Sequence, residues 1–274
     1  MKLSIADKRK GFRKLHESGC FVLPNPWDIG SARYLASLGF KAIASTSAGF
    51  AFSRGLPDNA VGRDAVLAHL RELVASTDLP VNADFENGFA DDPEELAENV
   101  RLAIETGIAG LSIEDSTGKS ADPLYTIEHG TNRIRTARRA IDKSGSDVVL
   151  VGRAECYLVG TEDISETTRR LKAYAEAGAD CLYAPGIDSL EQVAAIVDAV
   201  EPKPVNVLIS GPGSLTIADV AGVGVRRVSV GGALARAAWG GFIRAAKELA
   251  EQGTFGGFAG AAGHGELTSF FRKQ

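Results

Sequence analysis

The chain alternates from end to end between short apolar runs rich in β-forming residues and longer segments with helical spacing. The apolar runs fall at residues 20–24, 41–45, 79–84, 110–115, 147–153, 180–184, 204–209 and 226–231. The segments with apolar residues three and four positions apart fall at 31–39, 62–76, 92–107, 132–142, 162–178, 189–200, 214–222 and 233–253. Because the runs are continuously apolar, both faces of each predicted strand should be covered. This pattern is typical of β/α units that build a parallel sheet.

Eight such units in order, without a break in composition, predict one α/β domain over residues 1–274 with a (β/α)8 TIM barrel fold. A doubly wound open sheet is the alternative. The length suits a barrel, and 45% hydrophobic with 24% charged residues supplies a large core. Residues 252–274 begin with a segment rich in Gly and Ala and then carry the apolar pair Phe270 and Phe271. They predict a C-terminal extension able to cross to a neighbouring subunit.

Charge and hydropathy limit the partners that this chain can have. A net charge of -5 disfavours binding to nucleic acid or to an anionic membrane. The N-terminal segment lacks the apolar core of a signal peptide, and no run of about eighteen apolar residues occurs. We therefore expect a cytoplasmic protein with a small-molecule substrate. Cys20, Cys156 and Cys181 lack zinc-ligand spacing, which fits reduced thiols in the core.

Polar residues stand where the predicted strands end, and in TIM barrels these ends form the active-site mouth. The third run ends in Asp84 and is followed by Glu86. At the ends of other runs, or within them, stand Ser45, Thr46, Ser47, Glu114, Asp115, Arg153, Glu155 and Asn206. Carboxylates that crowd a partly dry mouth need a neutralising partner, and a divalent cation is the simplest. Oxygen ligands without His or Cys nearby suit Mg²⁺ or Mn²⁺.

Arg153 offers a planar fork of N–H donors for a substrate carboxylate or phosphoryl group. The alternative is that Arg153 only pairs with Glu155 or Glu114 inside the barrel. Bond chemistry beside a keto acid builds negative charge on an enolate oxygen, which Mg²⁺ stabilises as a Lewis acid. Donors from residues 45–47 would then add the oxyanion-binding part of the site.

Motifs along almost the whole chain resemble the isocitrate lyase and phosphoenolpyruvate mutase superfamily. They read, in order, FVLPNPWDIGSARYLASLGFKAIASTSAGFA, GLPD, ADFENGF, GLSIEDS, VGRAECY, YAEAGAD and VRRVSVGGALARAA. The resemblance implies a barrel whose last helix is swapped between subunits of a dimer or tetramer. It also implies a Mg²⁺-assisted reaction on a small α-keto acid or related carboxylate, in which a C–C or P–C bond is made or broken through an enolate.

The resemblance also implies roles for single residues. Asp84 matches a metal ligand, whereas Glu86 and Glu114 match residues that hold the waters of the ion. The strand-two turn, Ser45 to Ser47, matches a turn that binds the substrate carboxylate and enolate oxygen, with Ser45 and Thr46 also placed in catalysis. Asn206 is expected to bind substrate because it lies within the seventh run. Asp58, in GLPD, matches an acidic residue that positions the metal shell. Arg153 matches the arginine of an AR motif that here reads GR, with Gly152 in place of alanine.

The loop after the fourth run departs from the lyases of this superfamily. Lyases that cleave isocitrate or methylisocitrate carry a K-[KR]-C-G motif there, whereas residues 116–131 contain no cysteine. We therefore expect a phosphoenolpyruvate mutase-like lyase or mutase that does not cleave isocitrate. Asn132 leaves the mutase reaction open, and His129 is a possible acid or base. An oxaloacetate-type C–C hydrolase and a non-catalytic metabolite-binding barrel are the alternatives.

Overall fold

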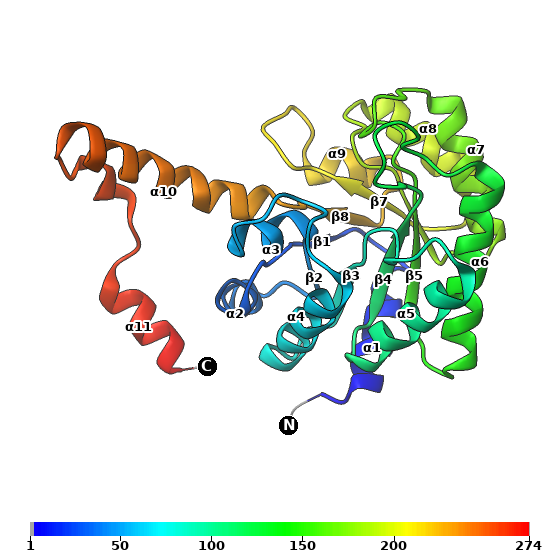
Figure 1. Cartoon of the computed structure of the whole chain (residues 1–274), viewed down its shortest axis with the longest axis horizontal. Coiled ribbons are helices and arrows are strands. Elements are labelled where there is room, and N and C mark those ends of the chain that lie inside the picture. Colours follow the sequence, from blue (N-terminus) through cyan, green and yellow to red (C-terminus); the bar gives the residue numbers. More distant parts are fainter. Residues whose placement is uncertain (1–2, 274) are drawn as a thin grey trace.

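A computed structural model describes residues 3–273 and contains eight parallel strands that alternate with helices (Figure 1). The strands are β1 (Phe21–Leu23), β2 (Ile43–Ala44), β3 (Val81–Asp84), β4 (Gly110–Glu114), β5 (Val149–Arg153), β6 (Cys181–Tyr183), β7 (Val205–Leu208) and β8 (Arg227–Ser229). The helices are α1 (Ile5–Leu15), α2 (Ile29–Ser37), α3 (Ser47–Ser53), α4 (Arg63–Ser76), α5 (Pro93–Glu105), α6 (Ile127–Lys143), α7 (Ile164–Glu176), α8 (Leu190–Val200), α9 (Ile217–Gly222), α10 (Ala233–Gln252), the 3₁₀ helix η1 (Gly256–Gly260) and α11 (His264–Arg272).

The strands form a nearly closed barrel, as the (β/α)8 prediction requires. Their order is β1-β8-β7-β6-β5-β4-β3-β2, and each neighbouring pair is parallel. The join between β1 and β2 is made by a backbone hydrogen bond of 3.0 Å from Ala44 N to the Pro24 carbonyl. Because β1 pairs with β8, the open doubly wound sheet is excluded.

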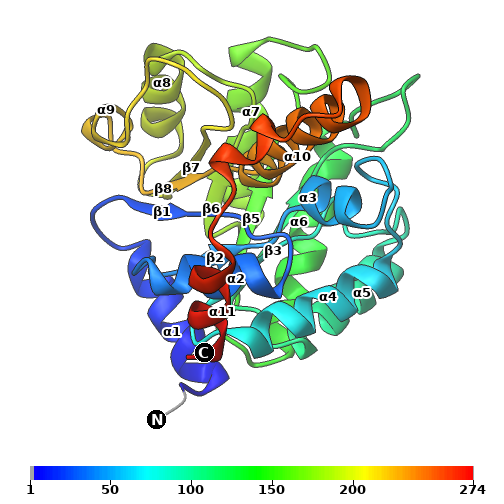
Figure 2. The ribbon, with the colours of Figure 1, turned by 90° about the vertical axis from the view of Figure 1, so that its left-hand side faces the viewer.

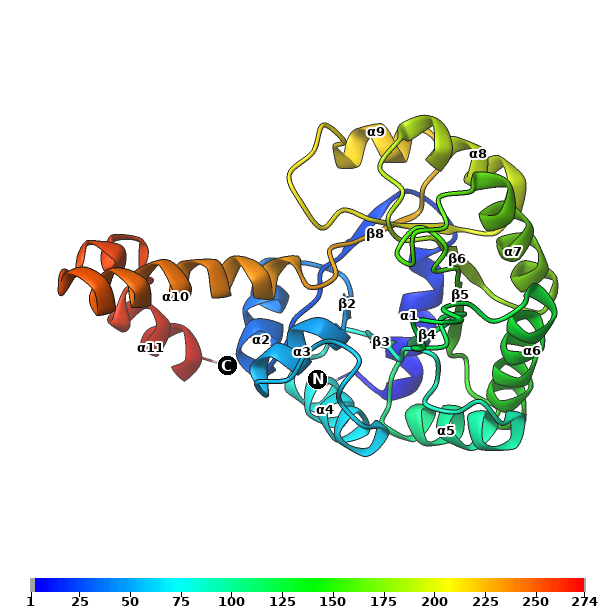
Figure 3. The same cartoon turned by 45° about the horizontal axis from the view of Figure 1, so that its top comes forward.

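The helices ring the outside of the barrel, as the view along it shows (Figure 3). One apolar cluster, which includes Ile43, Leu111 and Leu171, fills the space between sheet and helices. A second lies inside the barrel and includes Phe12, Val149 and Cys181. Phe12 comes from α1, so this N-terminal helix closes the end of the barrel opposite the strand C-termini. The continuously apolar strands are therefore covered on both faces, as predicted.

Helices α1 and α3 were not among the predicted helices, and helix α6 begins earlier than predicted. Helix α1 has few apolar positions, but Ser4 and Asp7 cap its start reciprocally. Helix α3 has only seven residues and begins at the Thr46 cap, where the sequence shows a turn at the end of a strand. Helix α6 begins at Ile127 and not at residue 132, because Thr126 accepts a hydrogen bond from the His129 backbone and caps it early.

The C-terminal extension is helical and stands away from the barrel (Figures 1 and 2). Only Ala235 of α10 is buried. Beyond η1, helix α11 turns back toward α2, where the rings of Phe270 and Tyr34 lie 5.3 Å apart. Within the predicted extension, residues 252–273 thus form an ordered segment that touches helix α2. None of the helices within residues 3–273 has the length and apolar character needed to cross a membrane.

Candidate active site

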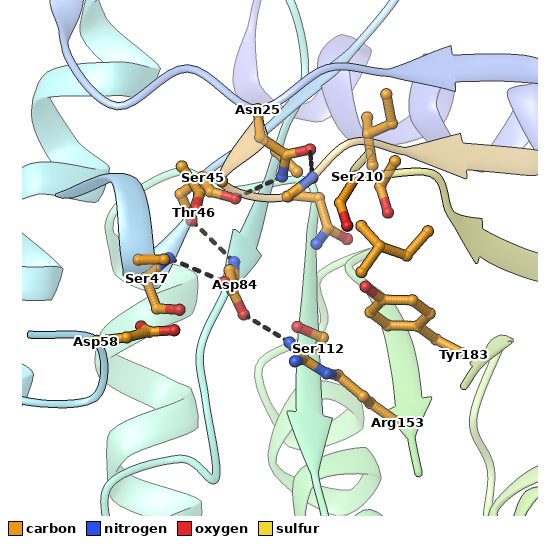
Figure 4. A pocket seen from close by; sticks show the side chains of 18 of the residues that line it. Asn25, Ser45, Thr46, Ser47, Asp58, Asp84, Ser112, Arg153, Tyr183 and Ser210 are labelled. Carbon is orange, nitrogen blue, oxygen red and sulfur yellow. Dashed lines mark hydrogen bonds and ion pairs between the residues drawn. The ribbon is translucent and has the colours of Figure 1, made fainter. Parts of the chain in front are cut away.

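A cavity of about 350 Å³ opens at the C-terminal ends of the strands. Six of the predicted site residues line it: Ser45, Thr46, Ser47, Asp58, Asp84 and Arg153. Figure 4 shows Asp84 between Ser47 on one side and Arg153 on the other. The other three predicted residues, Glu86, Glu114 and Asn206, are not among the residues that line the cavity.

The turn after β2 fixes Asp84. The Asp84 backbone N–H donates to Ser45 Oγ over 2.8 Å, and Ser47 N–H donates to Asp84 Oδ2 over 2.9 Å. Thr46 is committed to capping α3, because its Oγ1 accepts from Gly49 N–H at 3.2 Å. Asn25 secures the turn from β1 by donating to the Ser45 carbonyl at 2.8 Å. Sequence reasoning did not assign Asn25 a role, although it lies in the quoted FVLPNPWD stretch.

Arg153 crosses the mouth and pairs with three carboxylates. Its Nη1 lies 3.2 Å from Asp84 Oδ1 and 3.3 Å from Glu114 Oε2, while its Nε donates to Glu155. The pairing that the sequence left as an alternative for Arg153 is therefore present. A divalent cation, the simplest partner expected for these carboxylates, is therefore not their only counter-charge, because Arg153 supplies one positive charge itself.

The single positive charge of Arg153 does not balance the carboxyl groups at this mouth. Five carboxyl groups gather around it: Asp58, Asp84, Glu86, Glu114 and Glu155. Burial, together with the charges of Asp84 and Asp58, raises the pKa of Glu86 to about 8. Burial also raises the pKa of Glu114 well above its usual value, and it raises the pKa of Asp58. The carboxyl groups of this cluster therefore retain protons, which they would release when a cation binds.

The loop after β3 holds Glu86 in a left-handed backbone conformation, with φ of 48°. Its carbonyl accepts from Glu114 N–H at 3.1 Å, which ties the loop to β4. Gly88 follows at φ 77°, where a Cβ would come within 2.3 Å of Leu96 Cδ1. Asn99 of α5 then donates to the Gly88 carbonyl at 2.9 Å. Several contacts therefore hold Glu86 in this strained conformation, as is needed for strained residues at functional sites.

Helix α7 supports β5 from outside. A Cβ at Gly152 would come within 2.9 Å of Tyr174 Cβ, so the GR form of the motif makes room for this tyrosine. Tyr174 donates to Asp115 Oδ2 at 2.6 Å, and Arg170 pairs with the same oxygen at 3.0 Å. Asp115 therefore faces away from the cavity and is structural.

The loop after β4 is folded away from the cavity. Ser116 and Leu124 form an isolated antiparallel bridge, and Lys119 and Tyr125 both contact Asp91 in the loop after β3. His129 stacks on Tyr125 with 4.6 Å between ring centroids. No residue from 116 to 131 lines the cavity in this conformation.

The chemistry of the mouth suits a hard cation, although the side chains are not gathered around one point. In the part of the chain that the structure describes, no three Asp, Glu, His or Cys side chains stand in an arrangement that would hold a metal ion. Arg153 Nη1 contacts both Asp84 and Glu114, two of the predicted groups. The donors are all carboxylate oxygens, which Mg²⁺ and Mn²⁺ prefer.

Comparison with known proteins shows that this chain is similar to mutases, lyases and decarboxylases. The model of the phosphoenolpyruvate phosphomutase family matches residues 12–250. A crystal structure of a putative lyase/mutase from Burkholderia cenocepacia is 48% identical, with a TM-score of 0.95 over 98% of this chain and 97% of that one. Oxaloacetate decarboxylase of Pseudomonas putida is 30% identical over 83% of this chain and 79% of its own. The 2-methylisocitrate lyase of Escherichia coli is 32% identical over 60% of this chain and 56% of its own.

Proposed function

The chain belongs to the isocitrate lyase and phosphoenolpyruvate mutase superfamily, and we propose that it is a Mg²⁺-dependent lyase or mutase of a small α-keto acid. The reaction makes or breaks a C–C or P–C bond through an enolate. The observation that carries this proposal is the excess of carboxylates over guanidinium at the barrel mouth. Such an excess of carboxylates would attract a cation. Without that cation it would disfavour the binding of an anionic substrate.

In this proposal Asp84 holds the ion directly, and Glu86 and Glu114 hold its water molecules. When bound, Mg²⁺ or Mn²⁺ would supply Lewis-acid stabilisation of the negative charge on the enolate oxygen. The raised pKa values of Glu86 and Glu114 support this assignment, because both carboxyl groups are buried and the charges of neighbouring carboxylates add to the effect of burial. Asp58, whose carboxyl contacts the Ser47 side chain, positions the rim of the site.

The protein's own donors bind and orient the substrate. Ser45 Oγ accepts from the Asp84 backbone, which leaves its hydroxyl proton free to donate into the cavity. The Ser47 side chain stands beside it at the same rim (Figure 4). Arg153 grips a substrate carboxylate or phosphoryl group with paired N–H donors once it no longer has to neutralise Asp84. Thr46 fixes the turn as the cap of α3, and Asn206 is held by hydrogen bonds with Arg227 and Ser229.

The same superfamily membership leads us to propose a homo-oligomer, a dimer or tetramer, built through α10. This helix exposes large apolar side chains, among them Trp239, Phe242 and Ile243, along a segment that leaves the barrel. Exchange of α10 between neighbouring subunits would cover them. A cytoplasmic location remains a prediction.

Incubation with a panel of α-keto acids and phosphonates tests the proposal through product analysis. We expect turnover of at least one small keto acid that requires Mg²⁺ or Mn²⁺ and stops with chelator. Hydrolysis of oxaloacetate to oxalate and acetate would instead identify the hydrolase alternative. Metal binding without turnover of any compound would favour a non-catalytic metabolite-binding barrel.

A further inference from the structure

The loop that carries Glu86 is held from outside the barrel by a buried arginine of α6. Arg133 is 3% exposed, and its Nη1 donates to the Ala90 carbonyl at 2.7 Å. Its Nη2 donates to the Asn87 carbonyl of the same loop. One guanidinium therefore holds both ends of the turn that follows Glu86.

The backbone of this turn depends on its surroundings for its shape. Glu86 has φ of 48° and Phe89 has φ of 58°, and neither residue is a glycine. A left-handed backbone costs energy at such residues and persists only where neighbouring groups hold it. Asn99 of α5 holds the Gly88 carbonyl at 2.9 Å, and Arg133 holds a carbonyl on either side of it. The conformation of Glu86, and with it the position of its carboxyl group, therefore depends on Arg133.

Arg133 is oriented in turn by the loop after β4. The Tyr125 ring lies against the guanidinium, with 4.5 Å from Arg133 Cζ to the ring centroid. The Tyr125 backbone is fixed at both of its polar groups, because its N–H donates to the Asp115 carbonyl at 2.9 Å and its carbonyl accepts from Arg170 at 2.7 Å. The hydroxyl bond to Asp91 is therefore not needed to keep this ring in place.

The partners of Arg133 indicate a role in placing the main chain. Its hydrogen bonds go to two backbone carbonyls, which a planar guanidinium can reach with paired donors. Neither Arg133 nor Tyr125 is among the residues that line the cavity, so neither contacts a substrate held there in this conformation. Any effect of these two residues on the site must therefore pass through the loop that they hold.

We propose that Arg133 is a positioning residue of the metal site, which fixes Glu86 through the Asn87 and Ala90 carbonyls, and that Tyr125 acts on the site through Arg133. The inference rests on the proposed function, because it takes Glu86 as a residue that holds the waters of a bound Mg²⁺. It extends that function by linking the affinity for the metal to the loop after β4.

Calorimetric titration of Mg²⁺ into Arg133→Met tests the inference by the sign of the change. The variant keeps a long side chain but loses the donors, so we expect Mg²⁺ binding to weaken by about ten- to a hundredfold, as is typical when groups that orient metal-site residues are removed. Loss of a positive charge alone would act in the opposite direction and tighten the binding of a cation. Arg135→Met is the matched control, because it removes the same charge from an exposed position on the same helix. It should bind Mg²⁺ at least as tightly as the wild type.

Two changes at Tyr125 test the step from the loop after β4 to Arg133. Tyr125→Phe keeps the ring and should keep the wild-type affinity for Mg²⁺, whereas Tyr125→Leu removes the ring and should weaken binding. Adding Tyr125→Leu to Arg133→Met should weaken binding no further than Arg133→Met alone, because residues that act through a shared contact are not additive. Losses that add would overturn the role of Arg133 as the link.

Hydrogen exchange of residues 85–90, measured by mass spectrometry without metal, separates this inference from the proposed function. Arg133→Met should exchange faster in this segment than the wild type and Arg135→Met. The inference is overturned if Arg133→Met matches the wild type in this exchange or in its affinity for Mg²⁺. A wild type that binds no Mg²⁺ would instead refute the proposed function, and with it the link to the metal, whatever the exchange result.

If Arg133→Met does not fold, Arg133→Lys decides the question. Lysine keeps the positive charge but lacks the paired donors, so Mg²⁺ binding should still weaken and exchange of residues 85–90 should still accelerate. Wild-type values for both measurements would contradict the inference.

Discussion

Arg153 Nη1 lies 3.2 Å from Asp84 Oδ1, so a guanidinium from β5 neutralises the carboxylate predicted to bind metal on β3. Arg153 also pairs with Glu114 on β4, the strand that lies between β3 and β5. The arginine that should grip the substrate and the acids that should hold the ion are therefore coupled. In our account Arg153 would be free to bind the substrate when a bound divalent cation supplied the counter-charge at Asp84.

Arg153→Lys keeps the positive charge but loses the paired N–H donors. We expect substrate affinity to fall by roughly tenfold or more, because an ammonium cannot make the bidentate contact to a carboxylate or phosphoryl group. Steady-state kinetics on the substrate identified from the panel measures the change. Equal kinetic constants for the two proteins would show that Arg153 only neutralises Glu155, Glu114 and Asp84.

Glu86→Gln should stabilise the metal-free protein at high pH. The folded protein keeps the Glu86 proton up to a pKa of about 8, whereas the unfolded chain releases it near the ordinary value of 4.5. Stability therefore falls as pH rises between these two values, and glutamine removes that loss. We expect melting temperatures that agree near pH 4 and separate by several degrees at pH 8, since 1 kcal/mol shifts a protein of this size by about 2–4 °C.

The exposed Glu72→Gln is the control for this experiment, with chelator present throughout. It should leave the pH dependence of the melting temperature unchanged. A difference between Glu86→Gln and wild type that stays constant from pH 4 to pH 8 would contradict the buried, protonated state of Glu86.

Deletion of residues 252–274 should lower the melting temperature and dissociate the assembly. The deletion removes α11 and its contact between Phe270 and Tyr34 of α2. Sedimentation velocity on the truncated and full-length proteins measures the oligomeric state. Phe270→Ala, which removes the ring contact but keeps the chain length, should weaken the assembly less. A truncated protein that keeps both the number of subunits and the melting temperature of the full-length protein would count against a role of this segment in assembly.

Isocitrate and methylisocitrate should not be cleaved. The loop over residues 116–131 has no cysteine, and none of its residues lines the cavity, so no loop acid is placed to protonate a dicarboxylate carbanion. With Mg²⁺ present, chromatography should find no glyoxylate from isocitrate and no pyruvate from methylisocitrate. Robust release of glyoxylate by the pure protein would mean that another group serves as the acid.

The sequence predicted the barrel and six of the cavity residues because both depend on local patterns. Continuous apolar strands alternating with helices specify β/α units, and parallel strands must end at one rim, which brings Ser45, Asp84 and Arg153 together. Metal ligation by Asp84 and its neighbours remains a prediction, since their side chains are arranged around Arg153.

Features that depend on contacts across the barrel were missed. Arg227 begins a strand in the sequence VRRVS and resembles an ordinary solvated charge, until closure of the barrel buries it beside Asn82. Asn25 accepts from Val230 and Gly231 N–H, a contact over about two hundred residues that no local pattern indicates. Helix α1 was missed because its few apolar residues matter only where Phe12 enters the barrel.

Calorimetric titration of Mg²⁺ into the wild type and Asp84→Ala tests the central claim most directly. Asp84→Ala should lose measurable Mg²⁺ binding and nearly all activity, because Glu86 and Glu114 reach the ion only through water in our account. Asp91→Ala, a change to an exposed acid that holds Lys119 and Tyr125 outside the cavity, should bind Mg²⁺ like the wild type. Equal Mg²⁺ affinity in wild type and Asp84→Ala would contradict the assignment of the metal to this cluster.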